Sequence, residues 1–498
     1  MNIQSQSRPQ RYANIAVVLL SIVAIVVFLL VAIPRFLYPY EVQWMEGSML
    51  DHISRIFSGH SLYSQPSINF VPWLYTPCYY YAATLVCSLT GLSFVAARIP
   101  SLIATLGVII LLAWVVRKET RSSIFTIAAV GLYLASYVKT ELIMLSARVD
   151  PLFTFFVLAS AVTLYYSRNA RNVIFGAGLF VLCLFTKQTG IALLPFFAFG
   201  LYRKSGWRQC FQFTIVCIVA TLIILLLLNY FSNGWFSYYA LQIPRAGKGQ
   251  TLDWWFAIQG FVVYIVLRSW PIAIGLLALV GAQKIFLRSQ HQVSRPVEFF
   301  GIFFLGTTVV GFGGILNQGG GHNVFLPLAA ATAVFLPLMM NDKLVTHWLP
   351  RFGQWLLPIQ LLLLISYPWS AKENVVSNED AYNQEMFFHY VQSLQGEVWV
   401  PFHGFTWQMT GRKMYADYNA IRDVLLVGDR NARNLESELD SALVHHQWQY
   451  ILSDVQDTFP HYILRDSVKN LNRIRMRLIR DNQKREASPW IYIYVPSS

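Results

Sequence analysis

The sequence predicts an α-helical integral membrane bundle of about eleven spans followed by a small α/β domain. Of its 498 residues, 55% are hydrophobic and only 13% are charged. Apolar segments of about 20 residues recur as far as Trp369, which is typical of membrane-spanning helices and excludes one water-soluble globule. After Trp369 the composition becomes polar and mixed. We therefore expect a membrane module over residues 1–369 and a second domain over residues 370–498.

The first apolar segment runs from Ile15 to Ile33. It is too long and too uniformly apolar for the hydrophobic core of a signal peptide, and no small-residue cleavage site follows it. We therefore predict a permanent membrane anchor. The further apolar segments that predict spans are 95–116, 122–139, 151–167, 172–187, 189–203, 210–231, 258–282, 298–317, 322–340 and 352–368.

The orientation depends on the segment Cys78–Phe94, which could either span the bilayer or lie on its surface. If this segment lies along the outer surface, fifteen Lys and Arg residues fall in short loops on one side and six on the other. Basic residues concentrate in cytoplasmic loops of membrane proteins. We therefore predict a cytoplasmic N-terminus, with the loop 37–94 and the C-terminal domain on the outer side of the membrane.

The outer loop after the first span contains an amphipathic stretch from Met45 to Phe57. Apolar residues recur there at helical spacing, and polar residues occupy the opposite face. This pattern predicts a helix lying in the membrane interface. Asp51 and Arg55, four residues apart on it, are predicted to form a surface ion pair.

The C-terminal region shows strand-like runs between helical stretches. The predicted strands are Val398–Phe402, Val424–Val427, Gln449–Leu452 and Trp490–Val495, and the clearest helix is Glu436–His446. The five cysteines, Cys78, Cys87, Cys183, Cys210 and Cys217, lie within or beside apolar segments without metal-type spacing. We expect neither a disulfide framework nor a cysteine metal site.

Charged side chains from distant parts of the chain are predicted to meet at the outer face. The acids are Glu41, Glu46 and Asp150, and the cations or donors are Arg148, Lys187 and His322. Sugar transfer from a lipid phosphate needs a carboxylate that takes a proton from the acceptor hydroxyl. It also needs positive groups at the departing phosphate. Tyr75, Tyr79, Tyr80 and Tyr81 are candidates for lining a sugar pocket.

Each of these residues also has a structural interpretation. Arg148 and Asp150 could form an ion pair at a helix start, with Asp150 capping the helix opened by Pro151. Lys187 could extend its ammonium group to the lipid headgroups. His322 could be a structural residue of its glycine-rich turn.

An ordered set of short motifs resembles the polytopic glycosyltransferases of the GT-C fold. In particular, it resembles the bacterial group akin to protein O-mannosyltransferases and aminoarabinose lipid A transferases. The motifs are Gly59-His-Ser-Leu-Tyr63, Tyr75-Thr-Pro77, Ala97-Arg98, Ala147-Arg-Val-Asp-Pro151, Thr186-Lys-Gln-Thr-Gly190 and His322-Asn323 before Pro327. The resemblance covers most of residues 14–340. It implies a bacterial inner membrane, in which the outer side that carries the C-terminal domain is periplasmic.

This resemblance implies an inverting transfer from a polyprenyl-phosphate sugar donor, with an acid of the first outer loop as the base. Many family members carry Asp-Glu where this chain has Met45-Glu46, so Glu46 or Glu41 takes the role, and we favour Glu46. Asp150 matches the acid of the second outer loop. By position, Arg148, Lys187, His322 and the adjoining Asn323 are implied contacts of the substrate and its phosphate.

A cofactor is not firmly implied. The aminoarabinose enzymes carry Glu-Lys before the proline that corresponds to Pro77, and this chain has Tyr75-Thr76 instead. A divalent metal therefore stays an open alternative. The acceptor could be a lipid, a glycan or a protein, and nucleic acid is not an expected partner.

Two other classes of function compete with the enzyme. A transporter or lipid flippase would favour two similar halves with polar or broken helices near the middle of the membrane. No such symmetry is visible in the sequence. A scaffold protein would leave the grouping of Glu46, Asp150 and Lys187 unexplained.

Overall fold

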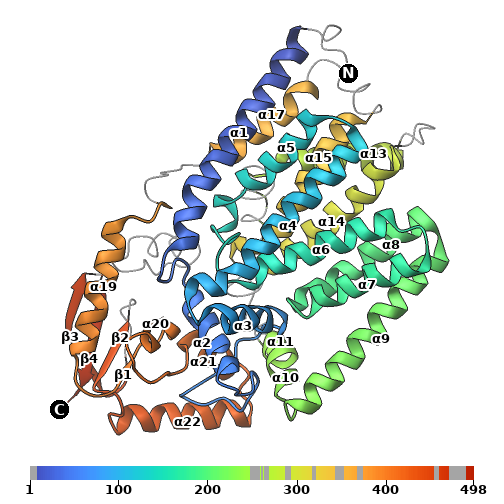
Figure 1. Cartoon of the computed structure of the whole chain (residues 1–498). Coiled ribbons are helices and arrows are strands. Elements are labelled where there is room, and N and C mark those ends of the chain that lie inside the picture. Colours follow the sequence, from blue (N-terminus) through green and yellow to red (C-terminus); the bar gives the residue numbers. More distant parts are fainter. Residues whose placement is uncertain are drawn as a thin grey trace.

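The computed structural model shows a large helical bundle with a small mixed sheet and its helices at one end (Figure 1). It describes residues 8–246, 258, 262, 269–286, 293–316, 321–342, 353–366, 374–453, 459–469 and 490–497. The helices are α1 (Arg8–Leu37), α2 (Glu46–Phe57), α3 (Cys78–Thr90), α4 (Phe94–Thr120), α5 (Ser123–Ala135), α6 (Val149–Tyr166), α7 (Ala170–Leu184), α8 (Leu194–Ser205), α9 (Trp207–Phe231), α10 (Trp235–Ser237), α11 (Ile243–Ala246), α13 (Pro271–Phe286), α14 (Arg295–Ile315), α15 (Leu326–Asn341), α17 (Gly353–Ile365), α19 (Asn378–Ser393), α20 (Gly404–Gln408), α21 (Tyr418–Leu425) and α22 (Arg430–Val444).

Short 3₁₀ or π segments join some of these helices, and four strands form the sheet. The short segments are η2 (Val138–Thr140), η3 (Gln188–Leu193), η4 (Tyr238–Gln242) and η7 (His322–Phe325). The strands are β1 (Val398–Trp399), β2 (Tyr450–Ser453), β3 (Tyr462–Lys469) and β4 (Trp490–Pro496).

The helical membrane character predicted from the sequence is confirmed. Among the described residues, six helices are long and apolar enough to cross a membrane. Each predicted span contains a helix among the described residues. Some residues of three predicted spans lie outside the described residues: 259–261 and 263–268 of the segment 258–282, residue 317 of the segment 298–317, and residues 352, 367 and 368 of the segment 352–368. The number of spans stays a prediction.

Burial separates central from peripheral helices. The most apolar stretch of η7 and α15 is 94% buried, whereas that of α9 is only 11% buried. In Figure 1, α15 lies within the bundle and α9 at its edge. An apolar helix that buries so little of itself in protein must meet another apolar medium, because exposing it to water would be unfavourable. The α9 surface therefore suits contact with lipid.

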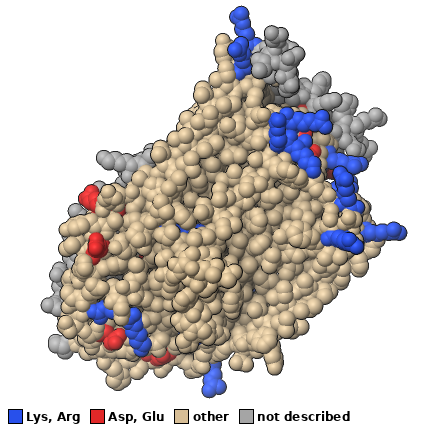
Figure 2. All heavy atoms as spheres, in the orientation of Figure 1, with Lys and Arg blue, Asp and Glu red and all other residues tan. Residues whose placement is uncertain are grey.

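The basic loops gather at one end of the bundle. Tyr166 donates a hydrogen bond to Glu119, Lys204 donates to the Ser167 carbonyl, and Arg203 pairs with Glu298. These contacts join the ends of α4, α6, α8 and α14. Figure 2 shows basic side chains grouped toward the upper right. A broad surface almost without charge separates this group from the charged side chains at the lower left. The grouping agrees with a common side for these loops, and the orientation in the membrane stays a prediction.

Helix α2 forms where the amphipathic pattern predicts it, but its surroundings differ from the prediction. Its apolar face packs through Met49 and Ile53 into a buried cluster. Its polar face is also buried, since Glu46 and Asp51 are 0% and 4% exposed. The C-terminal region covers this part of the polar face, since Gln408 and Gly404 lie against Asp51.

The predicted ion pair between Asp51 and Arg55 is also replaced by other contacts. Asp51 accepts a hydrogen bond from the Gln408 amide at 2.7 Å. Arg55 donates instead to the Ser61 carbonyl and the Ser64 hydroxyl. The two side chains thus serve different interfaces.

Helix α3 is the segment that the charge pattern places on the outer surface. It has 13 residues, too few to cross a bilayer core of about 30 Å. Leu85 and Leu89 are exposed on one face, whereas Tyr79 and Tyr80 are fully buried on the other. This amphipathic burial agrees with a helix lying on a surface.

The C-terminal region forms a four-stranded sheet of order β1-β2-β4-β3. β1 and β2 are parallel, and β4 pairs antiparallel with both β2 and β3. The strand predicted at Val424–Val427 is wrong. Asp417 caps a helix there, and Ala420, Ile421 and Val424 recur at helical spacing on its buried face. β3 was not predicted, whereas the predicted helix Glu436–His446 falls largely within α22.

The C-terminal region is packed against the outer loop. A single buried cluster contains Met49 and Tyr80 of the loop together with Trp399 and Leu435 of the sheet region. Ser48 donates to the Asp417 carboxylate, and the backbone N–H of Ala416 donates to the Ile68 carbonyl. The boundary at residue 369 stays a prediction, and residues 367–373 around it lie outside the described residues.

We predict that this contact loosens as pH rises. Burial raises the pKa of Asp417 to about 6 and raises that of Asp51 well above its usual value, while Glu41, His403 and Asp423 lie in the same interface or beside it. Folded-state pKa values above the unfolded values mean that native carboxyls hold protons which unfolded ones release. The stabilisation from Asp417, about 3 kcal/mol for a shift of about two units, is complete below pH 4 and is lost as pH rises to 6.

Hydrogen exchange of α2, α20 and α21 between pH 4 and 7, corrected for intrinsic rates, checks this prediction. Protection should fall as pH rises through 6. Asp417→Asn, which keeps an acceptor for Ser48 but cannot ionise, should reduce the slope. If protection did not change with pH, or changed equally in Asp417→Asn, Asp417 would not be the group responsible.

Candidate active site

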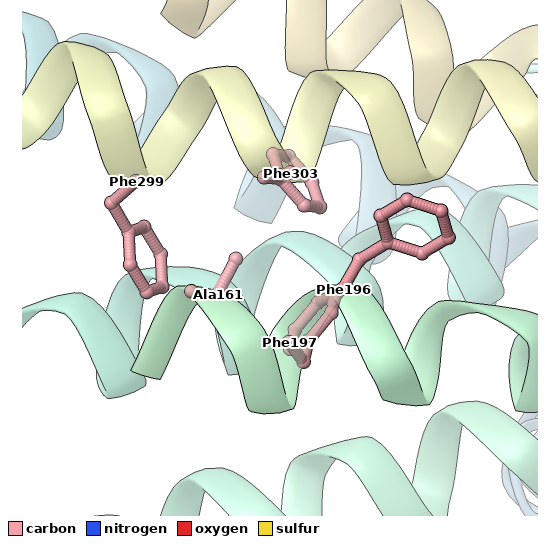
Figure 3. A pocket seen from close by; sticks show the side chains of 6 residues that line it. Ala161, Phe196, Phe197, Phe299 and Phe303 are labelled. Carbon is pink, nitrogen blue, oxygen red and sulfur yellow. The ribbon is translucent and has the colours of Figure 1, made fainter. Parts of the chain in front are cut away.

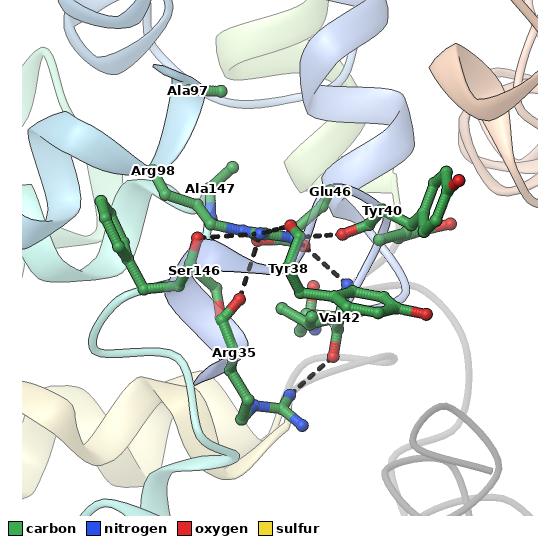
Figure 4. A network of polar contacts seen from close by, with 12 residues as sticks. Arg35, Tyr38, Tyr40, Val42, Glu46, Ala97, Arg98, Ser146 and Ala147 are labelled. Atoms are coloured by element: carbon green, nitrogen blue, oxygen red, sulfur yellow. Dashed lines mark hydrogen bonds and ion pairs between the residues drawn. The ribbon is translucent and has the colours of Figure 1, made fainter. Parts of the chain in front are cut away.

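The first-loop acid Glu46 is fixed in a buried ion pair with Arg98 at the start of α4 (Figure 4). Arg98 Nε and Nη2 donate to the two carboxylate oxygens at 2.9 and 2.7 Å. The backbone N–H groups of Val42 and Ala147 donate to the same oxygens at 2.8 and 2.7 Å. Neither Glu46 nor Arg98 is exposed at all. The carboxylate thus joins the first outer loop, α4 and the second outer loop.

This environment suits an anchor better than a base. Burial opposes ionisation of Glu46, but the Arg98 guanidinium and the two backbone donors outweigh it and hold the pKa of this carboxyl below its usual value. A base must be reachable by the proton that it takes. Glu46 would have to give up a bidentate, charge-assisted pair, which is among the stronger interactions in proteins.

The other first-loop acid, Glu41, points toward the C-terminal region. Its Oε2 lies 3.0 Å from Nδ1 of His403, and its Oε1 accepts a bond from the Gly47 N–H at 3.4 Å. The backbones approach closely here, since a Cβ on Gly47 would lie 3.3 Å from the nitrogen of Gly404. Glu41 therefore belongs to the interface of α2 with the C-terminal region.

A second group of charged residues meets at the start of α6, and we call it the polar centre: Glu141, Arg148, Asp150, Lys187 and Asn323. Lys187 Nζ lies 2.6 Å from Asp150 Oδ1, and the Asn323 amide donates to the same oxygen at 3.1 Å. Arg148 Nε lies 3.6 Å from Asp150 Oδ2. The structure thus brings together residues that lie up to 182 positions apart.

Local backbone geometry explains how the polar centre forms. α6 begins at Val149 with Arg148 as the extended residue before it, so Arg148 and Asp150 leave the same helix start. Lys187 occupies the equivalent extended position before η3. Its pairing with Asp150 and its low exposure of 8% argue against the alternative that Lys187 reaches the headgroups.

The two groups are adjacent through the second outer loop. Ala147 donates to Glu46, and the next residue, Arg148, donates through Nη1 to Gln43 Oε1 at 3.1 Å. Ser101 of α4 also donates to the Arg148 carbonyl at 3.3 Å. The Glu46 pair therefore fixes the backbone from which Arg148 extends.

Several buried polar atoms around the polar centre have no hydrogen-bond partner among the residues that the structure describes. They are Arg148 Nε, Asp150 Oδ2, Gln188 Oε1, Tyr80 Oη and Trp73 Nε1. Unsatisfied buried polar groups are rare and costly in folded proteins. These atoms are therefore available to a polar ligand.

Aromatic rings line the same region. The Arg148 guanidinium lies 6.0 Å from the Trp44 ring, which meets Trp73 edge to face at 6.2 Å. Trp73 in turn stacks with Tyr75 at 6.5 Å. Of the four tyrosines predicted to line a sugar pocket, Tyr75 and Tyr80 act electrostatically on Arg148.

The remaining two tyrosines of that set serve other contacts. Tyr79 donates to the Ala97 carbonyl at 2.9 Å, and Tyr81 is half exposed on α3. Tyr79 nevertheless lies close enough to Arg148 for the guanidinium charge to act on it, whereas no contact of Tyr81 with the polar centre is seen among the described residues.

The glycine turn before α15 is only partly described, because 317–320 lie outside the described residues. His322 contributes its backbone N–H, which donates to Glu141 Oε1. Asn323 contributes its side chain, as described above. Both predicted residues thus reach the polar centre.

Glu141 is the residue that the sequence interpretation missed. Its only sequence signal is that it is the sole acid between Arg121 and Asp150. Glu141 and Leu142 both have positive φ angles, 61° and 59°. Non-glycine residues in this region are uncommon and tend to occur at functional sites.

An apolar cavity elsewhere in the bundle has a different character (Figure 3). It is lined by Ala161, Phe196, Phe197, Gly200, Phe299 and Phe303. No polar side chain enters it, so it offers nothing that would orient a sugar or a phosphate.

The polar centre does not fit a divalent metal. Within the described part of the chain, no group of three or more His, Cys, Asp or Glu residues could hold one. Asp150 is already paired with two cationic side chains, which would repel a metal ion. We derive no step through a metal.

Comparison with known proteins finds a match in structure and none in sequence. No protein-family model and no curated protein matches the chain. The structure of ArnT from Cupriavidus metallidurans bound to undecaprenyl phosphate aligns with a TM-score of 0.54 at 13% identity, over 96% of this chain and 97% of ArnT. The chain has the GT-C fold of ArnT.

The likeness to ArnT includes the C-terminal region, because the alignment spans nearly the whole of both chains. The apo state of the same ArnT aligns with a TM-score of 0.43 at 13% identity, over 96% of this chain and 97% of ArnT. The Archaeoglobus fulgidus oligosaccharyltransferase complex with zinc and sulfate aligns at 0.43 with 10% identity, over 87% of this chain and 68% of that one. The ArnT alignment at a TM-score of 0.54 confirms the predicted GT-C-like helical membrane fold, and the number of spans stays a prediction.

We predict that Glu46→Gln lowers stability. The substitution leaves the buried Arg98 charge without its counter-ion, and breaking a buried pair in this way costs about 3 kcal/mol. The free energy of unfolding measured in detergent should fall by this amount. Glu436→Gln, which replaces an exposed acid of α22, serves as the control. Unchanged stability together with abolished transfer would instead support Glu46 as the base.

Proposed function

We propose that the protein transfers a sugar from a polyprenyl-phosphate donor to an acceptor at the outer face of a bacterial inner membrane. The observation that carries this proposal is the polar centre. It places two cationic side chains, Arg148 and Lys187, beside unpartnered polar atoms and aromatic rings at one end of an ArnT-like bundle. The ArnT structure was determined with undecaprenyl phosphate, which supports a lipid of this class as the partner.

Arg148 and Lys187 are the groups we propose at the phosphate. As the bond between the sugar and the phosphate oxygen breaks, the phosphate leaves with the electron pair and gains negative charge. Positive groups fixed in a site that excludes water stabilise such charge strongly. Asp150 and Asn323 hold the Lys187 ammonium in position through Asp150 Oδ1.

The aromatic rings suit the sugar. Trp44, Trp73 and Tyr75 offer flat apolar faces close to Arg148, and sugar rings expose apolar C–H faces that pack on such surfaces. Unpartnered Trp73 Nε1 and Tyr80 Oη could then bond sugar hydroxyls. This arrangement would hold the anomeric carbon near the phosphate contacts.

Glu41 is the first-loop acid that we propose as the base, because among the described residues its carboxylate is held by His403 and one long backbone hydrogen bond and not by a bidentate ion pair. Its carboxylate takes the proton of the acceptor hydroxyl while the acceptor oxygen attacks the anomeric carbon from the side opposite the phosphate, which inverts that centre. His403 Nδ1 at 3.0 Å orients the Glu41 carboxylate. The C-terminal region would in this way contribute to catalysis.

We predict that Lys187→Ala weakens binding of the lipid phosphate more than it weakens binding of the acceptor. Loss of one charge-assisted bond should raise the Kd for undecaprenyl phosphate about tenfold. Equilibrium binding in detergent measures this, with Lys413→Ala, an exposed lysine, as the control. An equal effect on donor and acceptor would argue against a phosphate contact.

We predict that Glu41→Gln reduces turnover by about 10²-fold or more while leaving donor binding intact, because it removes a general base. The assay follows release of undecaprenyl phosphate from a panel of undecaprenyl-phosphate sugars with envelope extracts as acceptors. Lack of release from every donor by the unaltered protein would sink the proposed function. Full turnover by Glu41→Gln would reject only the base.

A further inference from the structure

The carboxylate of Glu141 lies at the start of a long buried helix. Its Oε1 accepts the backbone N–H of His322, the first residue of η7, and η7 and α15 run together over 20 residues. The start of a helix carries partial positive charge and unpaired N–H groups, which bind anions such as phosphate. Glu141 therefore occupies a position that is built for an anion.

The surroundings of this position favour an anion from two further sides. The positive charges of Arg148 and Lys187 act on the Glu141 carboxyl, and they outnumber the single opposing negative charge of Asp150. Gly321 leaves the necessary space, because a Cβ at this residue would overlap the Glu141 carboxylate. The site thus combines a helix start, two cationic side chains and the space that Gly321 leaves by having no side chain.

Two buried atoms of the polar centre point to a ligand independently of the helix start. Arg148 is 3% exposed, and its Nε has no hydrogen-bond partner among the described residues. Asp150 Oδ2, which faces Arg148 Nε across 3.6 Å, is likewise without one, because that separation is longer than a hydrogen bond. Glu141 satisfies the His322 N–H but does not hydrogen-bond Arg148 Nε.

Glu141 is held in place at a conformational cost. It and Leu142 adopt left-handed backbone conformations that side chains disfavour. Burial raises the pKa of Glu141 despite the nearby cations, so the site compensates its charge incompletely. Movement of the Glu141 carboxylate away from this position would allow the backbone strain to be released.

We propose that the Glu141 carboxylate is a placeholder in the phosphate-binding position of the site, and that the phosphate of the substrate lipid displaces it. This inference rests on the proposed function for the identity of the lipid. The phosphate would accept the His322 N–H, lie against Gly321 and bond the Arg148 side chain. Glu141 would swing away with its loop, which relieves the left-handed backbone.

The test measures binding of two phosphate probes to purified full-length variants in detergent. Undecaprenyl phosphate is the lipid probe, and inorganic phosphate is the soluble one. Glu141→Ala removes the competing carboxylate, so its Kd for undecaprenyl phosphate should fall about tenfold, the factor expected for displacing one charge-assisted hydrogen bond. Glu141→Gln keeps the acceptor oxygen without the charge and should show a smaller gain.

Two variants control the result. Glu436→Gln removes an exposed acid of α22 and should leave both Kd values unchanged. Adding Gly321→Ala to Glu141→Ala places a methyl group in the cradle and should abolish the gain in affinity. Size-exclusion profiles verify that the variants are folded. If Glu141→Ala does not fold, the change in Kd of Glu141→Gln decides the test.

The outcomes separate this inference from the proposed function. Undecaprenyl phosphate binding that is unchanged or weakened by both Glu141 substitutions overturns the placeholder and leaves the function standing. Tighter inorganic phosphate binding by Glu141→Ala without any undecaprenyl phosphate binding supports the anion site and rejects the lipid donor.

Discussion

The ion pair between Glu46 and Arg98 is the constraint on which the end of the bundle that holds the polar centre depends. Arg98 also donates to the carbonyls of Arg35, Tyr38 and Tyr40, so it gathers the end of α1 and the first outer loop around one guanidinium. The Glu46 carboxylate then reaches the second loop through Ala147. Such a buried pair is expensive to desolvate, and its value lies in fixing geometry more than in raising stability. Here it fixes the relative positions of three segments that supply the polar centre.

The charged side chains of the polar centre can be buried because their opposite charges neutralise one another. Asp150 is paired with Lys187 and lies beside Arg148, and an isolated charge at that depth would be strongly unfavourable. The arrangement nevertheless leaves polar atoms without partners. That combination, near-neutral overall and incompletely hydrogen-bonded, is what a site for a negatively charged and hydroxylated substrate requires. The surrounding tryptophans and tyrosines exclude water and so strengthen each interaction.

The sequence predicts the helices well because apolar length is a strong local signal. It fails where distant segments decide the outcome. The polar face of α2 is buried because Gly404 and Gln408 of the C-terminal region cover it, and nothing in residues 45–57 reveals this. The run Val424–Val427 is apolar enough for a strand, but the Asp417 cap and the helical spacing of its neighbours prevail.

The candidate site was predictable to the same extent. Asp150 and Lys187 are foreseen because charges beside apolar spans are costly and therefore informative. The separation of Glu41, Glu46 and Asp150 into different environments depends on side-chain direction, which the sequence does not encode locally. Glu141 escaped notice because a lone loop acid carries no pattern.

The most direct test of the account is an experimental structure of the protein with undecaprenyl phosphate bound. The account predicts phosphate density within hydrogen-bond distance of Arg148 and Lys187, between the helix starts of α6 and η7, with the lipid chain leading into the bundle surface. Phosphate density at another place, with the polar centre unchanged and closed, would contradict it.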